Sequence, residues 1–148
     1  METKAKLETV LKEAMKAGDE VRKRTVRMAL AAIHQQEVDR QVKLDEAAVL
    51  SILQKEIKTR RESVEEARGA NRPDIVAATQ AEILVLQGYL PEALSTEELK
   101  TLVDAAILEA GAVSPADMGK VMKLLKERVA GRSPGDQVSV MVRQALQK

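Results

Sequence analysis

The side chains best suited to chemistry in this sequence are basic, and they gather in residues 117–148. This segment holds seven Lys and Arg residues against three acidic residues, which gives it a net charge of +4. Basic side chains in such a segment can neutralise the phosphates of a nucleic acid, and binding through them weakens as salt rises. The alternative is that exposed Lys serves solubility and that Arg near a helix C-terminus complements the helix dipole.

The spacing of these basic residues places some of them opposite an apolar stripe. Lys120 and Lys123 lie one helical turn apart, on the side away from Val121 and Leu125. Gly119 precedes them, and a residue without a side chain would let a nucleic-acid backbone approach closely. The candidate RNA-binding residues are Gly119, Lys120, Lys123, Arg128, Arg132 and Arg143.

Other kinds of reactive site find little support in the sequence. The chain has one histidine, His34, without a second histidine at metal-ligand spacing, and it has no cysteine. No serine lies in a Gly-x-Ser-x-Gly elbow, and Gly119-Lys120 lacks the earlier glycine and the following Ser or Thr of a phosphate-binding loop. We therefore expect no catalytic residues, no metal and no cofactor, which points away from a self-contained enzyme.

A second group of basic residues occurs near the middle of the chain. It comprises Lys55, Lys58, Arg60 and Arg61, within a segment with helical periodicity. Arg61 can also pair with Glu65 one turn later. The first 94 residues carry equal numbers of acidic and basic groups, so only the last segment is electropositive.

The composition predicts the kind of fold that must position these residues. One Tyr is the only aromatic residue, so the core must consist of aliphatic side chains, as is usual in helix bundles. The lack of aromatics also removes the stacking platforms of single-stranded nucleic-acid binders. No run of eighteen apolar residues occurs, and no apolar segment follows Met1. We expect a soluble, cytoplasmic protein without a membrane segment.

The sequence signals for helix boundaries are clearest in the second half of the chain. Ser95 and Glu98 form a capping-box pattern, and the formula Ser-Pro-x-Asp begins at Ser114 and again at Ser133. In that formula serine would cap the helix and proline would be its first residue. Three helices should therefore begin near residues 95, 114 and 133, and Gly111 and Gly131 should end the first two.

Longer helices are expected in the first half. Apolar periodicity and end signals predict helices over residues 3–17, 19–40, 45–69 and 73–88. Leu90-Pro91 then interrupts the pattern. We predict an all-α fold with long-helix hairpins in an N-terminal domain, residues 1–91, followed by a small three-helix domain, residues 92–148.

Several motifs together resemble those of one family. They are Gln54-Lys55-Glu56-Ile57-Lys58, Arg61-Glu62-Ser63-Val64-Glu65-Glu66, Tyr89-Leu90-Pro91, Asp117-Met118-Gly119-Lys120-Val121-Met122 and Gly131-Arg132. The combination resembles the free-standing GatB/YqeY proteins, and its last part is similar to the tail domain of the B subunit of the aspartyl/glutamyl-tRNA amidotransferase. Ala67, Thr79 and Pro134 depart from the family pattern, at positions that concern packing and capping.

The resemblance implies a binding role. In the amidotransferase this tail contacts tRNA, whereas the chemistry of the carbon–nitrogen ligase, which uses glutamine as amido donor, belongs to another domain. We therefore expect an accessory protein without its own catalytic centre that interacts with tRNA, with an amidotransferase or with another translation protein. Two alternatives remain open, a protein-interaction or stability module without RNA contact, and a non-catalytic participant in amido transfer to aminoacyl-tRNA.

Overall fold

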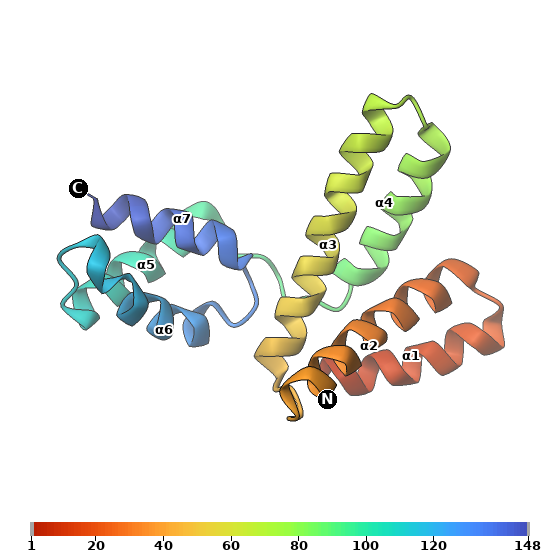
Figure 1. The fold of residues 1–148 in the computed structure, drawn as a ribbon, viewed down its shortest axis with the longest axis horizontal. Coiled ribbons are helices and arrows are strands. Elements are labelled where there is room, and N and C mark those ends of the chain that lie inside the picture. The colour runs from red at the N-terminus through yellow and green to blue at the C-terminus, as the bar shows by residue number, and fades with distance from the viewer. Residues whose placement is uncertain (1, 148) are drawn as a thin grey trace. The chain divides into compact units, whose positions relative to one another are not determined.

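The computed structural model describes residues 2–147, and all of their regular secondary structure is helical (Figure 1). No strand occurs within that range, so the all-α fold predicted from composition is confirmed. The helices are α1 (Thr3–Ala17), α2 (Glu20–Arg40), α3 (Glu46–Gly69), α4 (Pro73–Gln87), α5 (Thr96–Ala110), α6 (Met118–Val129) and α7 (Gly135–Leu146), with a short 3-10 turn, η1 (Pro115–Asp117), before α6.

The chain forms two compact units, each with its own core. Unit 1 is Met1–Leu90 and contains α1 to α4, and unit 2 is Pro91–Lys148 and contains α5 to α7. The segment between α4 and α5 includes Leu90-Pro91, where the sequence pattern is interrupted. The division into an N-terminal domain, residues 1–91, and a three-helix domain, residues 92–148, stays a prediction.

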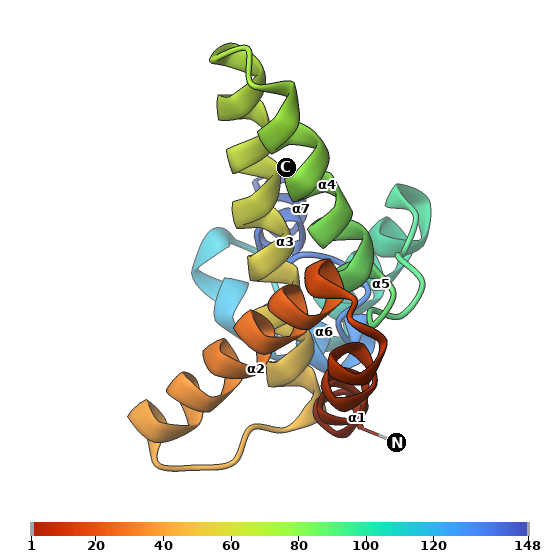
Figure 2. The ribbon, with the colours of Figure 1, turned by 90° about the vertical axis from the view of Figure 1, so that its right-hand side faces the viewer.

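In unit 1, α1 runs beside α2 and α3 runs beside α4 (Figures 1 and 2). The core consists of aliphatic side chains, and Leu7, Ile33, Leu53 and Leu86 are fully buried in it. Tyr89 packs against the same core from the end of α4. This arrangement needs no ring stacking, in agreement with the near absence of aromatic residues.

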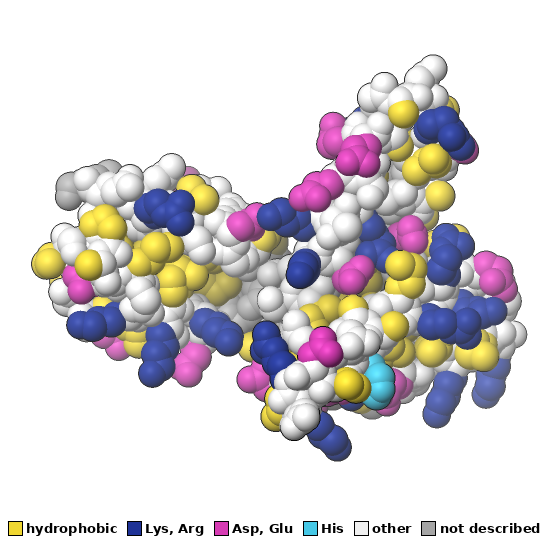
Figure 3. All heavy atoms as spheres, in the orientation of Figure 1, with side chains coloured by type: hydrophobic (Ala, Val, Ile, Leu, Met, Phe, Trp, Pro, Cys, Tyr) yellow, Lys and Arg dark blue, Asp and Glu magenta, His cyan; other side chains and the backbone are white. Residues whose placement is uncertain are grey.

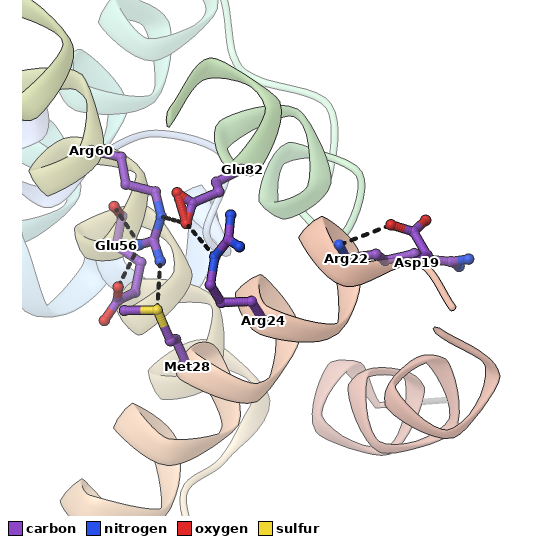
Figure 4. Close-up of polar contacts among 7 residues, drawn as sticks. All are labelled: Asp19, Arg22, Arg24, Met28, Glu56, Arg60 and Glu82. Carbon is purple, nitrogen blue, oxygen red and sulfur yellow. Dashed lines mark hydrogen bonds and ion pairs between the residues drawn. The ribbon is translucent and has the colours of Figure 1, made fainter. Parts of the chain in front are cut away.

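Local capping signals position the helices of unit 1 as predicted. The Asp19 carboxylate accepts a hydrogen bond of 3.1 Å from the backbone N–H of Arg22 at the start of α2, and Asp45 accepts one of 2.9 Å from Ala48 at the start of α3. Both satisfy backbone donors that the first helical turn leaves unpaired. Figure 4 shows the Asp19 cap.

A buried polar cluster joins three helices of unit 1 (Figure 4). The Arg60 side chain of α3 donates a hydrogen bond of 2.6 Å to Glu56 and lies 3.8 Å from the Met28 sulfur of α2. Its Nε is 4.0 Å from Glu82 of α4, too far for a hydrogen bond, and Glu82 also pairs with Arg24 of α2 at 3.7 Å. Arg60 is only 7% exposed.

This burial separates Arg60 from the other basic residues of its segment. Arg60 is not part of an exposed basic cluster, because its side chain is buried and pairs with Glu56 inside unit 1. Lys55, Lys58 and Arg61, the other members of that group, are exposed. Periodicity identified the helix but did not reveal that acidic partners from α3 and α4 meet Arg60 there.

Unit 2 is built from three helices around a second aliphatic core. Leu99, Val103, Val121, Leu125 and Val142 are fully buried, so α5, α6 and α7 each contribute to it. The predicted capping box is confirmed, as the Ser95 hydroxyl accepts from the Glu98 backbone N–H and the Glu98 carboxylate accepts from the Ser95 backbone N–H, both at 3.1 Å.

The two Ser-Pro-x-Asp formulas have different outcomes. Ser114 is the N-cap and Pro115 the first residue of the 3-10 turn η1, which leads directly into α6, and the Asp117 carboxylate reaches back to the N–H groups of Val113 and Ser114, at 3.0 and 3.4 Å. The second formula differs from the prediction. Pro134 is extended, with ψ 142°, so α7 begins one residue later at Gly135 and Ser133 is buried instead of capping it.

Candidate nucleic-acid interface

Helix α6 presents Lys120 and Lys123 to solvent. Val121, Leu125 and Val129 are buried along its inner side, and residues three apart on the other side of the helix are therefore directed outward. Both lysines are exposed, and neither forms an ion pair within residues 2–147. Their ammonium groups are available for an external anion.

Lys126 is a third exposed lysine on α6 that the candidate residues did not include. It follows Lys123 by three residues, is exposed, and forms no ion pair with any described residue. The regular spacing of Lys120, Lys123 and Lys126 could have identified it. We call these three residues the α6 lysines.

The outer side of α6 is not uniformly positive. Glu127 is exposed beside the α6 lysines, so the four side chains carry a net charge of +2. Glu127 follows Lys123 by four residues and so lies one helical turn from it, where its charge opposes phosphate approach; Lys120 is two turns away.

Arg128 is engaged in an interhelical contact within unit 2. Its guanidinium forms an ion pair and a hydrogen bond with Glu109 of α5. The side chain is about one-third exposed, so it is accessible, but binding a phosphate would compete with Glu109. Arg128 is thus a poorer candidate for nucleic-acid contact than its sequence position suggested.

Arg132 is also held by internal contacts. Its Nε donates a hydrogen bond of 2.7 Å to the Glu92 carbonyl oxygen, and its own carbonyl accepts one of 2.9 Å from the Leu94 N–H. These bonds fix the segment before α5 against the turn between α6 and α7. The Gly131-Arg132 motif therefore has a structural role inside unit 2.

Arg143 lies on α7, apart from the α6 lysines in sequence and on a different helix. It is exposed, and no ion pair holds it within the described part of the chain. In Figure 3 the Lys and Arg side chains of unit 2 occur over α6 and, separately, over α7, with hydrophobic surface between them. The predicted residues thus form no single continuous patch on the face drawn.

Gly119 lies in the first turn of α6 and is exposed. A Cβ built on it would meet no atom within 4 Å. No neighbouring helix of the described residues approaches this glycine closely, because the space beside it is open. Approach by an RNA backbone stays a prediction.

Asp117 sets the electrostatics at the start of α6. Its pKa is held below the ordinary value, chiefly by the hydrogen bond from the Val113 backbone N–H, with further contributions from Ser114 and from the charge of Lys120. Partial desolvation opposes these effects. The carboxylate therefore stays ionised at neutral pH and offsets part of the Lys120 charge.

The described residues hold neither a metal-ligand cluster nor a helix suited to crossing a membrane. His34 is exposed on α2, as an ordinary surface residue would be. No group of three or more His, Asp and Glu side chains in residues 2–147 is placed to hold a metal ion. Within the same range, no helix combines the length and apolar character needed to cross a membrane.

Comparison with protein-family models gives a match over nearly the whole chain. The model of the family described as Yqey-like protein matches residues 4–146. The match includes both units and all seven α-helices except Thr3, the first residue of α1. The family resemblance noted in the sequence motifs is confirmed at this level.

Curated relatives carry the name Altered inheritance of mitochondria protein 41, mitochondrial. Those from Lachancea thermotolerans, Pyrenophora tritici-repentis and Eremothecium gossypii are 40%, 35% and 39% identical to this chain over 91, 128 and 109 residues. The alignments cover 61%, 83% and 71% of this chain, which spans 49%, 71% and 59% of those relatives.

These relatives contradict the cytoplasmic localisation expected from the N-terminal residues, because their names describe mitochondrial proteins. The expectation relied on the absence of an apolar segment after Met1. That criterion detects secretory leaders and membrane anchors and does not detect targeting to an organelle by a polar, amphipathic segment.

Proposed function

The chain belongs to the Yqey-like protein family, and from that premise we propose that it is a tRNA-binding accessory protein that contacts the phosphate backbone through unit 2. The observation that carries the proposal is the set of exposed α6 lysines, which no described acidic side chain neutralises by an ion pair. The similarity of this segment to the amidotransferase tail supports tRNA as the nucleic acid.

The proposed mode of recognition is electrostatic. Ammonium groups on one helix can follow a line of phosphates, and each neutralised phosphate releases counterions. The only aromatic residue, Tyr89, lies in unit 1 and packs against its core, so base stacking on unit 2 is not part of the proposal. Recognition would rest on the shape and charge of the RNA.

We propose binding and not catalysis for this chain. Its single histidine is exposed on α2, and the sequence has no cysteine, so the usual pairs of nucleophile and base have no counterpart among its residues. In this proposal an amido-transfer reaction, if the protein takes part in one, would be carried out by a partner while unit 2 holds the RNA.

The salt dependence of tRNA binding tests the proposal. Unfractionated tRNA would be titrated with the full chain at several salt concentrations, and log K plotted against log salt. Each phosphate contact contributes a slope of about 0.7 to 0.9 in magnitude. Replacing Lys120, Lys123 and Lys126 together by Gln should therefore flatten the slope by about two units and weaken binding at low salt.

A matched variant controls for net charge. Lys6, Lys12 and Lys16 are three exposed lysines on α1, and replacing them by Gln removes the same number of charges from a single helix of unit 1. This variant should keep the slope of the unmodified chain. Equal flattening by both variants, or no tRNA binding at low salt, would overturn the proposal in favour of a module without specific RNA contact.

A further inference from the structure

Unit 2 has a groove, lined largely by apolar side chains, that α6 does not help to form. It lies between α5 and α7, has a volume of about 750 Å³, and is lined by Val103, Ile107 and Leu108 of α5 and by Met141 and Ala145 of α7. Val113, in the loop after α5, lies at one end. No residue of α6 contributes to its lining, so the groove and the α6 lysines are separate surfaces.

Large aliphatic side chains at this groove are in contact with water. Leu108 is 84% exposed and Val113 is 85% exposed, the two highest values among the large exposed hydrophobic residues. A second, smaller hollow shares Met141 and Gln144 with the groove, and its lining includes Val140, which is 48% exposed, beside the polar Asp136 and Gln137. Large aliphatic side chains that are exposed at one groove are typical of an interaction site.

The loop at the end of the groove is held in place by Asp117. Its carboxylate accepts hydrogen bonds from the backbone N–H groups of both Val113 and Ser114. Gly111, at the C-terminus of α5, adopts a left-handed conformation with φ 65° and turns the chain into this loop. Val113 is therefore exposed even though hydrogen bonds hold its loop in place.

The shape of the groove suits a helix. Its walls are two helices of the same bundle, and a helix lying between them would complete a four-helix bundle. The wall from Thr96 to Leu108 is about 18 Å long at 1.5 Å per residue, which corresponds to three to four helical turns of a ligand.

Charged residues in the groove lining indicate which charges the bound helix should carry. Lys100 and Asp104 line the α5 wall one turn apart, and neither forms an ion pair with a described residue. A ligand with an acidic and a basic side chain one turn apart could pair with both, while its aliphatic side chains enter the groove.

We propose that the α5–α7 groove binds an amphipathic α-helix of a protein partner, with aliphatic residues at i, i+3 or i+4, and i+7, and with opposite charges facing Lys100 and Asp104. This inference does not depend on RNA binding, because it uses a different face of unit 2. Together the two faces would connect a protein partner with a bound nucleic acid.

A designed peptide tests the groove in the full chain. The probe is a fluorescein-labelled helical peptide of about fourteen residues, a length chosen from the groove, with leucines on one face and Glu and Lys one turn apart at its edge. A control peptide has the same composition but leucines spread around the helix. Fluorescence anisotropy should give binding of the first peptide that is at least about tenfold tighter than that of the second.

Matched protein variants locate the binding. Leu108→Asp should weaken binding of the designed peptide by about tenfold or more, whereas Leu84→Asp should leave it unchanged. Leu84 is a suitable control because it is 71% exposed on α4 of unit 1. Lys100→Glu should also weaken binding, and exchanging the peptide's Glu for Lys should restore it.

Three results would overturn the proposal. The first is equal binding of the two peptides, and the second is equal weakening by Leu108→Asp and Leu84→Asp, since both would indicate non-specific apolar adhesion. The third is a concentration-dependent dimer in sedimentation experiments that Leu108→Asp abolishes, with no peptide binding by the unmodified chain. That result would mean that a second copy of the chain covers the groove.

Discussion

The Nε of Arg132 donates a hydrogen bond of 2.7 Å to the backbone carbonyl of Glu92, forty residues earlier in the chain. A second bond, from the Leu94 N–H to the Arg132 carbonyl, runs between the same two segments. The turn between α6 and α7 is thereby attached to the segment that leads into α5. A basic residue that is a candidate for phosphate binding thus also forms a structural contact within the unit that presents the α6 lysines.

Replacing Arg132 by Gln should therefore lower stability. The variant loses the hydrogen bond from Nε to Glu92, and a bond of this kind contributes about 1 kcal/mol to the free energy of unfolding. Urea unfolding followed by circular dichroism would measure the difference. Arg143→Gln is the control, because Arg143 is exposed and forms no ion pair with any residue from 2 to 147, and this change should affect stability little. Equal stability of the Arg132 variant and the unmodified chain would contradict this role.

Asp117 should make stability depend on pH. Its pKa in the folded chain is lowered, first by the Val113 N–H, so ionisation of this carboxyl favours the folded state. The contribution is complete above the ordinary Asp pKa of about 3.9 and is lost as pH falls through the lower folded-state pKa. In Asp117→Asn this dependence should be missing.

The measurement is the difference in unfolding free energy between the unmodified chain and Asp117→Asn from neutral to acidic pH. Taking a difference removes the contributions of Glu37, Asp74 and Glu98, whose pKa values are also lowered. The difference should be largest at neutral pH and shrink in acid. A difference that stays constant with pH would show that the ionised carboxylate is not what stabilises the loop.

Gly119→Ala should stabilise unit 2. A Cβ at this position would have open space around it, and Ala is favoured over Gly in helices by about 0.5 to 1 kcal/mol. The melting temperature of the variant should rise. If tRNA affinity is unchanged, Gly119 is not a place of close backbone approach, whereas weaker tRNA binding in a more stable variant would keep it in the interface.

Arg60→Met should destabilise unit 1 because it leaves Glu56 without the partner that lies 2.6 Å away. Loss of a buried ion pair costs about 3 to 5 kcal/mol, but both acidic partners are partly exposed and Glu82 retains Arg24, so about 1 to 3 kcal/mol is expected. Arg61→Met, at the exposed neighbouring position, should change stability by less than about 0.5 kcal/mol. Similar losses in both variants would argue against a special role for the buried cluster.

Features controlled by local sequence were predictable. Asp19, Asp45 and Ser95 each accept a hydrogen bond from a backbone N–H three residues later, which is a contact within one helical turn. The aliphatic composition likewise predicted an all-α fold. The exposure of Lys120 and Lys123 followed from helical periodicity, because Val121 and Leu125 had to be buried on the other side.

Features controlled by distant contacts were not predictable from spacing. Arg128 meets Glu109 from another helix, and Arg60 meets Glu82 across unit 1. Neither partner is identified by helical spacing, so free and internally paired Arg residues look alike in the sequence. Ser133 matched a cap formula but is buried, because Pro134 takes an extended conformation and delays the start of α7.

The position of Tyr89 has a practical consequence for spectroscopy. It is the only intrinsic fluorophore of the chain and packs against the core of unit 1, so its emission reports on the environment of that core. Far-ultraviolet circular dichroism, in contrast, reports on the helices of both units. Following both signals through one denaturant titration would reveal, without labels or truncation, whether the two units melt in a single transition or in two.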